Sequence, residues 1–176
     1  MSAARDMLCD TASAVFAEAT TPGMTPVEEA GFALLLMPEA DGGFGGDWGD
    51  LIAGLKIAGV AVPDLPVADL ILSGLSDAPD NLHAAATVSL MAGAMGQALA
   101  LSVEHVNTRQ QFGRPLGKFQ AVQQSLAVMA CEVRAVDAAA AAMAARLDAT
   151  GFDAADFEIA AAKLRALNDL LRDGLI

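Results

Sequence analysis

Hydrophobic residues recur at three- and four-residue steps along most of the second half of the chain. One series runs through residues 88–106, a second through 119–147 and a third through 157–171. This spacing gathers apolar side chains on one face of a helix, so each series predicts a long amphipathic helix. We therefore expect residues 84–174 to form three long helices that pack nearly antiparallel.

Helix-capping signals predict shorter helices in the first half. Thr25-Pro26-Val27-Glu28 combines a Thr cap, a Pro at the first helical position and a Glu three residues after the cap. This sequence predicts a helix from Pro26 to about Leu36. Asp47 precedes a further helix, which Pro63 ends, and a first helix is expected over residues 3–19.

Two segments rich in turn-forming residues separate these helices. The Gly-rich turn from Gly42 to Gly46 lacks the preceding strand and the G-x-G-x-x-G spacing of a dinucleotide site, so we interpret it as a bend. The connector from Pro63 to Asn81 is rich in Pro, Gly and Asp and marks a module boundary. We accordingly divide the chain into an amino-terminal helical segment, residues 1–80, and a carboxy-terminal helical bundle, residues 81–176.

Composition supports an all-α fold and narrows the function. Hydrophobic residues make up 55% of the 176 residues, but aromatics only 5%, and Tyr is absent. Ala-rich, aromatic-poor chains are typical of packed helices. No uninterrupted apolar run of about eighteen residues occurs, so no membrane span is expected. Cys9 and Cys131 lie far apart without a metal-ligand pattern, so we expect neither a disulfide nor a metal site, and place the protein in the reducing cytoplasm.

Charge is distributed unevenly. The formal net charge is -12, which argues against a nucleic-acid partner. Residues 1–83 hold 13 acids against two bases, whereas residues 84–176 hold 9 acids against 8 bases. The first half therefore presents an acidic surface.

The segment from Arg109 to Gln120 carries the strongest functional signal. It lies between two predicted helices, and Arg109, Arg114 and Lys118 fall within ten residues while residues 105–131 contain no acid. Such a cluster favours an anionic ligand. The alternative is structural: Arg109 would interact with a helix carboxy terminus, and the phenylalanines of the segment would fill a gap in the core.

The stretch Arg109-Gln-Gln-Phe-Gly…Phe119-Gln120 resembles the carboxy-terminal helical domain of the acyl-CoA dehydrogenases. The resemblance continues through residues 121–129 and back along 91–97, and a weaker one, at residues 36–45, is to the amino-terminal helical domain of the family. It implies a helical bundle of the family's carboxy-terminal type. It also implies that residues of this stretch contact the adenylate half of FAD, which a neighbouring subunit largely holds. The implied cofactor-binding residues are Arg109, Gln111, Phe112 and Gln120.

The chain departs from the family pattern at two places. No strand-rich β-domain separates the two helical parts, although in the family that domain supplies most contacts to the flavin ring. Where some members carry a catalytic Glu, this chain has His83-Ala-Ala-Ala. Alanine cannot abstract a proton and His83 is a poor candidate for the base, so no catalytic residue is assigned.

Two functions follow from these observations. The first is an FAD-linked oxidoreductase that acts on a CH–CH group of an acyl-CoA and passes electrons to an electron-transfer flavoprotein. This chain would be a shortened subunit of that enzyme and would need a partner. The alternative is a non-catalytic helical module for interaction or oligomerisation. In either case we expect a homo- or hetero-oligomer, because the Ala-rich run at 138–142 adds a second apolar face to its helix.

Overall fold

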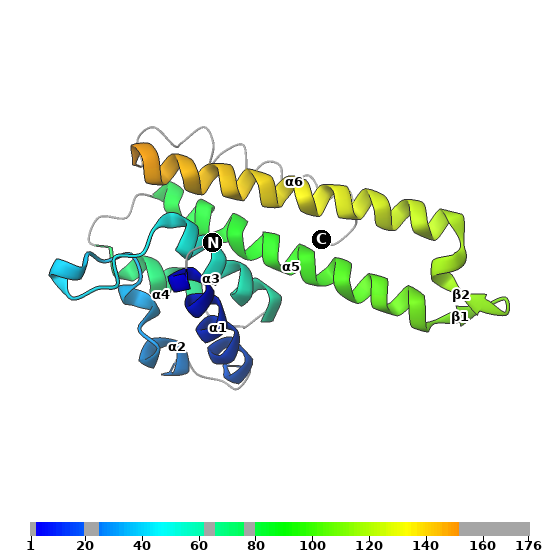
Figure 1. The fold of residues 1–176 in the computed structure, drawn as a ribbon, viewed down its shortest axis with the longest axis horizontal. Coiled ribbons are helices and arrows are strands. Elements are labelled where there is room, and N and C mark those ends of the chain that lie inside the picture. Colours follow the sequence, from blue (N-terminus) through cyan, green and yellow to red (C-terminus); the bar gives the residue numbers. More distant parts are fainter. Residues whose placement is uncertain (1–2, 20–24, 62–65, 76–79, 152–176) are drawn as a thin grey trace.

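The computed structural model describes residues 3–19, 25–61, 66–75 and 80–151. Two long helices, α5 (Asp80–Thr108) and α6 (Gln120–Thr150), run antiparallel as a hairpin, and the shorter helices gather against one end of it (Figure 1). The all-α prediction is confirmed. The remaining elements are α1 (Ala3–Glu18), α2 (Thr25–Glu29), η1 (Phe32–Leu34), η2 (Glu39–Asp41), α3 (Trp48–Ala61), α4 (Val67–Ser73), β1 (Gln110–Gln111), β2 (Arg114–Pro115) and η3 (Leu116–Lys118).

The hairpin helices follow the apolar spacing of the sequence. Met95 packs with Val133 and Val136, while Val88 packs with Met143 nearer the other end of the hairpin. Two of the three predicted long helices are thus confirmed, and the third, at residues 157–171, lies outside the described residues. Five of the six buried positions of α6 lie in its carboxy-terminal half, which is the half that the shorter helices approach, and Val133 lies just before the midpoint.

Helix α3 lies at the centre of the fold. Its Leu55 belongs to the core formed with α1 and α4, and its Ile52 packs into the core that α5 and α6 share around Val88 and Met143. Lys56 of α3 also reaches α6, where its Nζ lies 2.5 Å from Asp137 Oδ1. These contacts connect α3 to both long helices, and the predicted division of the chain at residue 80 stays a prediction.

The packing of α3 against α5 is so close that it requires glycine in both helices. A Cβ on Gly59 would collide with the Leu90 carbonyl group, and one on Gly93 would collide with the Lys56 carbonyl oxygen. Gly96, one turn further along α5, meets nothing within 4 Å. Of the two α5 glycines, Gly93 and Gly96, only Gly93 is therefore needed for the backbone-to-backbone contact.

Polar side chains from three parts of the chain meet at the amino terminus of α3. Asp47 Oδ1 accepts a 2.7 Å hydrogen bond from the Asp50 amide, and Asp50 Oδ2 accepts one of 3.2 Å from the Asp47 amide, as in a capping box. Arg5 of α1 donates to both carboxylates, and its hydrogen bond to Asp50 raises the pKa of its guanidinium. Asp148 of α6 accepts a 2.8 Å hydrogen bond from the Trp48 amide. The start of α3 is thereby tied to both α1 and α6.

Two of the expected local elements are corrected. The helix predicted from Pro26 to Leu36 stops as α2 at Glu29, because Gly31 adopts a left-handed conformation with φ 74° before the short turn η1. The connector from Pro63 to Asn81 contains α4, whose Ile71 and Leu72 are buried. The other two helices and the Gly-rich bend follow the sequence prediction.

One described helix meets the length and hydropathy of a membrane span. This is Leu82–Thr108, with a mean hydropathy of 1.5, and 39% of its most apolar window is buried within the chain. A core helix of a soluble protein passes the same test. In this fold the helix packs against α3, α4 and α6.

We predict that Gly93→Ala destabilises the fold while Gly96→Ala does not. The methyl group at position 93 forces α3 and α5 apart, which should lower the free energy of unfolding by about 1–3 kcal/mol or more. At position 96 Ala meets open space, and the change should be neutral or stabilise by roughly 0.5–1 kcal/mol. Urea denaturation followed by circular dichroism measures both values. Equal effects of the two substitutions would contradict the close α3–α5 contact.

Candidate functional site

The segment between the long helices folds into a small β-hairpin at the distal end of the α5–α6 hairpin (Figure 1). Strands β1 and β2 pair antiparallel, with Gln110 opposite Pro115 and Gln111 opposite Arg114. Phe112 and Gly113 form the two-residue loop. The sequence did not predict these strands, because they are only two residues long and contain no β-branched residue.

The loop places Phe112 in an unfavourable backbone conformation. Its φ is 52° and that of Gly113 is 77°, and positive φ at both central positions is what a type I′ hairpin loop requires. Asn or Gly normally takes the first position, and a non-glycine residue there costs on the order of 1–3 kcal/mol. Phe112 is also 92% exposed. A large apolar ring held both strained and exposed contributes little to the core, which makes Phe112 a candidate binding residue.

Two neighbouring side chains support this loop. The Arg114 guanidinium lies 4.1 Å from the centre of the Phe119 ring, which is a cation–π contact. Phe112 meets Phe119 edge to face, with 6.1 Å between ring centroids. Phe119 therefore contacts both Arg114 and Phe112. A backbone hydrogen bond also joins the two ends of the β-hairpin, since the Leu116 amide donates to the Arg109 carbonyl at 2.9 Å.

All four cofactor-binding residues predicted from the sequence lie at this end of the hairpin. Arg109 follows α5, and its amide donates to the His105 carbonyl at 2.8 Å. Gln111 belongs to β1, Phe112 to the loop, and Gln120 is the first residue of α6. All four are exposed, as a surface site requires.

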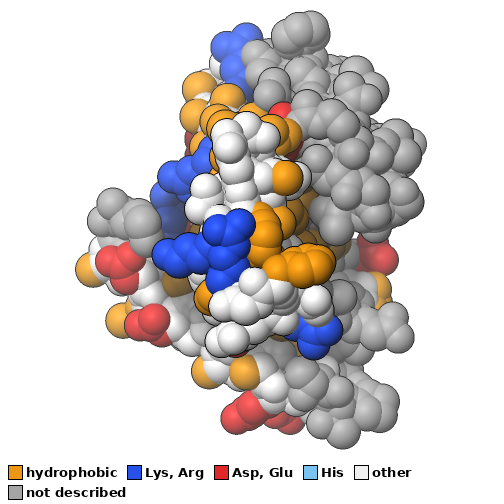
Figure 2. All heavy atoms as spheres, turned by 90° about the vertical axis from the view of Figure 1, so that its right-hand side faces the viewer, with side chains coloured by type: hydrophobic (Ala, Val, Ile, Leu, Met, Phe, Trp, Pro, Cys, Tyr) orange, Lys and Arg blue, Asp and Glu red, His pale blue; other side chains and the backbone are white. Residues whose placement is uncertain are grey.

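Cations dominate the electrostatics of this end. Figure 2 faces it and shows Lys and Arg side chains beside hydrophobic ones. Within the described part of the chain, Arg109, Arg114 and Lys118 make no salt bridge to a carboxylate. Within that part of the chain no carboxylate neutralises their charge, and the predicted anionic ligand stays a prediction. The sequence did not predict that Phe119 contacts Arg114 and Phe112. The apolar spacing around Phe119 suggested only a core position.

Neither described histidine is joined to a catalytic constellation at this end. His83 lies near the opposite end of α5, where its Nδ1 is 3.2 Å from Asp69 Oδ1 of α4. His105 is exposed in the last turn of α5. Among the described residues, no group of three or more His, Cys, Asp or Glu side chains is placed to hold a metal ion.

Fold and site together define a helical-hairpin module that presents a cationic, aromatic tip. Residues 74–172 match the family model described as the acyl-CoA dehydrogenase carboxy-terminal domain. The chain belongs to the acyl-CoA dehydrogenase family. It is similar to the acyl-CoA dehydrogenase FadE34 of Mycobacterium tuberculosis, with 36% identity over 87 residues, which is 49% of this chain and 12% of that protein. No solved structure matches the chain.

We predict that Arg114 and Phe119 are energetically coupled. A double-mutant cycle with Arg114→Gln and Phe119→Leu should give a coupling free energy of about 0.5–1 kcal/mol, the strength of an exposed cation–π pair. The matched cycle with Lys118→Gln should give a value near zero, because Lys118 has no such contact in the described structure. Urea denaturation provides each free energy. A Lys118 cycle equal to the Arg114 cycle would show that the stack contributes nothing specific.

Proposed function

We propose that this chain is a subunit of an FAD-linked oxidoreductase that acts on a CH–CH group of an acyl-CoA. Membership of the acyl-CoA dehydrogenase family, whose members generally bind FAD, supports the reaction class. The observation that carries the proposal is the exposed, strained Phe112 beside cations that pair with no carboxylate in the described structure. A surface of this composition suits the adenosine diphosphate part of FAD.

The residue types at the tip fit that group. The Arg109 guanidinium offers a fork of donors that matches pyrophosphate oxygens. The carboxamides of Gln111 and Gln120 each offer a donor and an acceptor. Phe112 offers a flat apolar face to adenine. In this proposal the Phe119–Arg114 stack positions Phe112 before the cofactor arrives, which reduces the entropy lost on binding.

In this proposal the cofactor and a partner chain carry out the chemistry at the reacting atoms. The flavin would supply the hydride acceptor for this reaction, and an electron-transfer flavoprotein would receive the electrons. This chain would hold and orient the adenylate end of the cofactor. A partner chain would supply the β-domain contacts and the base that removes the substrate proton, since the sequence assigns no catalytic residue to this chain.

The distal half of the α5–α6 hairpin supports an oligomer. The shorter helices cover only the other half (Figure 1), and Leu101, Val103 and Val128 are between 40% and 53% exposed. Large apolar side chains left this exposed on the long helices are candidates for an interface. We propose that a second copy or a different subunit covers this half, and that the assembly works in the cytoplasm.

One observation favours the alternative of a non-catalytic helical module. The start of α5 carries His83 followed by three alanines, where some members of the family carry their base. In that case the tip and the apolar face of the hairpin would serve assembly alone. The matched segment spans 12% of its mycobacterial relative, so the activity of the whole relative does not decide between the two functions.

The decisive experiment is calorimetry with FAD on the chain alone and with any protein that co-purifies with it. We expect weak or undetectable binding to the chain alone and clear binding once a partner is present. In the complex, Arg109→Ala should weaken FAD binding by about 1.5–3 kcal/mol, the contribution of a charged hydrogen bond. Arg109→Lys should also weaken it because the fork geometry is lost, and Gln120→Ala should cost less.

Arg134→Ala is the matched control. Arg134 is an 82% exposed arginine of α6, and its closest carboxylate in the described structure is Asp137 of the same helix. FAD binding should not change in this variant. Equal losses at positions 109 and 134 would indicate a general charge effect. Absence of FAD binding in every preparation, together with normal assembly of Arg109→Ala, would leave the non-catalytic module.

We further predict that Val128→Glu shifts the protein towards the monomer. A charge buried in an apolar interface without a partner costs several kcal/mol, which is a large part of a typical association energy. Met7→Glu, at a 70% exposed position of α1, should leave the oligomer intact. Light scattering at micromolar concentration measures both. A wild-type monomer would refute the oligomer.

A further inference from the structure

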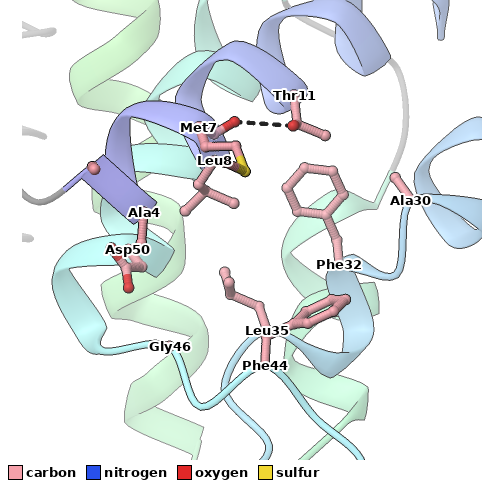
Figure 3. Close-up of a pocket in the computed structure, with 11 residues that line it drawn as sticks. Ala4, Met7, Leu8, Thr11, Ala30, Phe32, Leu35, Phe44, Gly46 and Asp50 are labelled. Carbon is pink, nitrogen blue, oxygen red and sulfur yellow. Dashed lines mark hydrogen bonds between the residues drawn. The ribbon is translucent and has the colours of Figure 1, made fainter.

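A cavity of about 500 Å³ lies in the amino-terminal part of the molecule, between α1 and the segment that leads from α2 to α3 (Figure 3). Its volume falls within the range of small-molecule sites, roughly 300–1,000 Å³. It is separate from the tip of the α5–α6 hairpin, because α5 and α6 contribute none of its lining. The lining residues come from α1, from residues 30–46 and from the first turn of α3.

The lining is almost entirely hydrocarbon. In Figure 3, Met7 and Leu8 of α1 face Phe32 and Leu35 across the cavity, and Phe44 lies beside Leu35. Phe32 and Leu35 are buried in the core beneath. Met7 is 70% exposed and contributes to the open rim. A ligand of low polarity would cover this apolar surface, and each buried methylene group would contribute about 0.8 kcal/mol.

The two polar side chains of the lining are already engaged within the chain. The Thr11 hydroxyl donates to the Met7 carbonyl at 2.9 Å. Asp50 accepts from Arg5 Nε at 2.6 Å and from the Asp47 amide at 3.2 Å. The Thr11 proton is thus used within α1, and the Asp50 carboxylate only accepts, so neither side chain offers a hydrogen-bond donor to an anionic headgroup. The cavity therefore selects for apolar shape rather than for a particular polar group.

Charge disfavours an anionic ligand. Residues 1–83 contain 13 acids and two bases, and one of those bases, Arg5, is committed to Asp47 and Asp50. Burial raises the pKa of the Cys9 thiol on α1, and the neighbouring Asp6 and Asp10 raise it further, as expected in a negative potential. A carboxylate or phosphate at the rim of this cavity would be repelled.

We propose that this cavity is a binding site for an uncharged, hydrocarbon-rich small molecule, of the kind represented by a medium-chain aliphatic alcohol. The site is independent of the flavin site at the tip. Its selectivity is opposite in charge, because the tip attracts anions and this cavity disfavours them.

The test is a fluorescence titration of the full chain with the uncharged probe N-phenyl-1-naphthylamine, followed by competition. We expect saturable binding of the probe, displacement by 1-decanol, and displacement by decanoate only at a concentration at least about tenfold higher, a difference of 1.4 kcal/mol. Absence of saturable binding would overturn the site. Equal competition by decanoate would overturn its charge selectivity.

A matched pair of substitutions on α1 localises the site. Ala4 and Ala14 are both exposed residues of this helix, but only Ala4 lines the cavity. Ala4→Phe fills the space and should weaken probe binding by about tenfold or more, whereas Ala14→Phe should leave it within about twofold. Met7→Glu adds a charge at the exposed rim without disturbing the core and should also weaken binding. Unchanged affinity in both Ala4→Phe and Met7→Glu would place the probe elsewhere and refute the proposal.

Discussion

The close crossing of α3 and α5 is the constraint on which the rest of the structure depends. Gly59 and Gly93 let the two backbones approach until carbonyl groups of each helix lie where a side chain would otherwise stand. At this distance Ile52 reaches the core that α5 shares with α6. The crossing also places α1, which packs on α3, and α4 packs beside it against α5 and η1.

A consequence of this arrangement is that the two ends of the α5–α6 hairpin have different tasks. One end is buried by α3 and secured by the hydrogen bond from the Trp48 amide to Asp148. The other end projects beyond the shorter helices and carries the strained loop (Figure 1). The stable end supplies the free energy that allows Phe112 to be held exposed, because local strain persists only where the surrounding structure enforces it. This division suits a domain that presents a binding edge to another subunit.

Much of the helical framework could be predicted from spacing and caps, and the errors have physical reasons. The helix predicted over Pro26–Leu36 was too long because Gly31 takes a left-handed conformation beneath Phe44, a contact with a residue thirteen positions away. Helix α4 was missed because the Pro- and Gly-rich composition around it suggested a connector. Burial of Ile71 and Leu72 against other helices stabilises it, and that packing is not encoded in the local pattern.

The sequence by itself determined helices α5 and α6 and the family, and it indicated a candidate binding segment, because periodicity and the motif around Arg109 are local properties of the chain. It also identified the residue types that suit a flavin nucleotide. The tertiary structure decided how these residues are presented. Stacking of Arg114 on Phe119, the left-handed conformation of Phe112 and the cavity under α1 each require groups brought together by chain reversal or by helix packing. Such contacts depend on distances in space, which the order of residues alone does not specify.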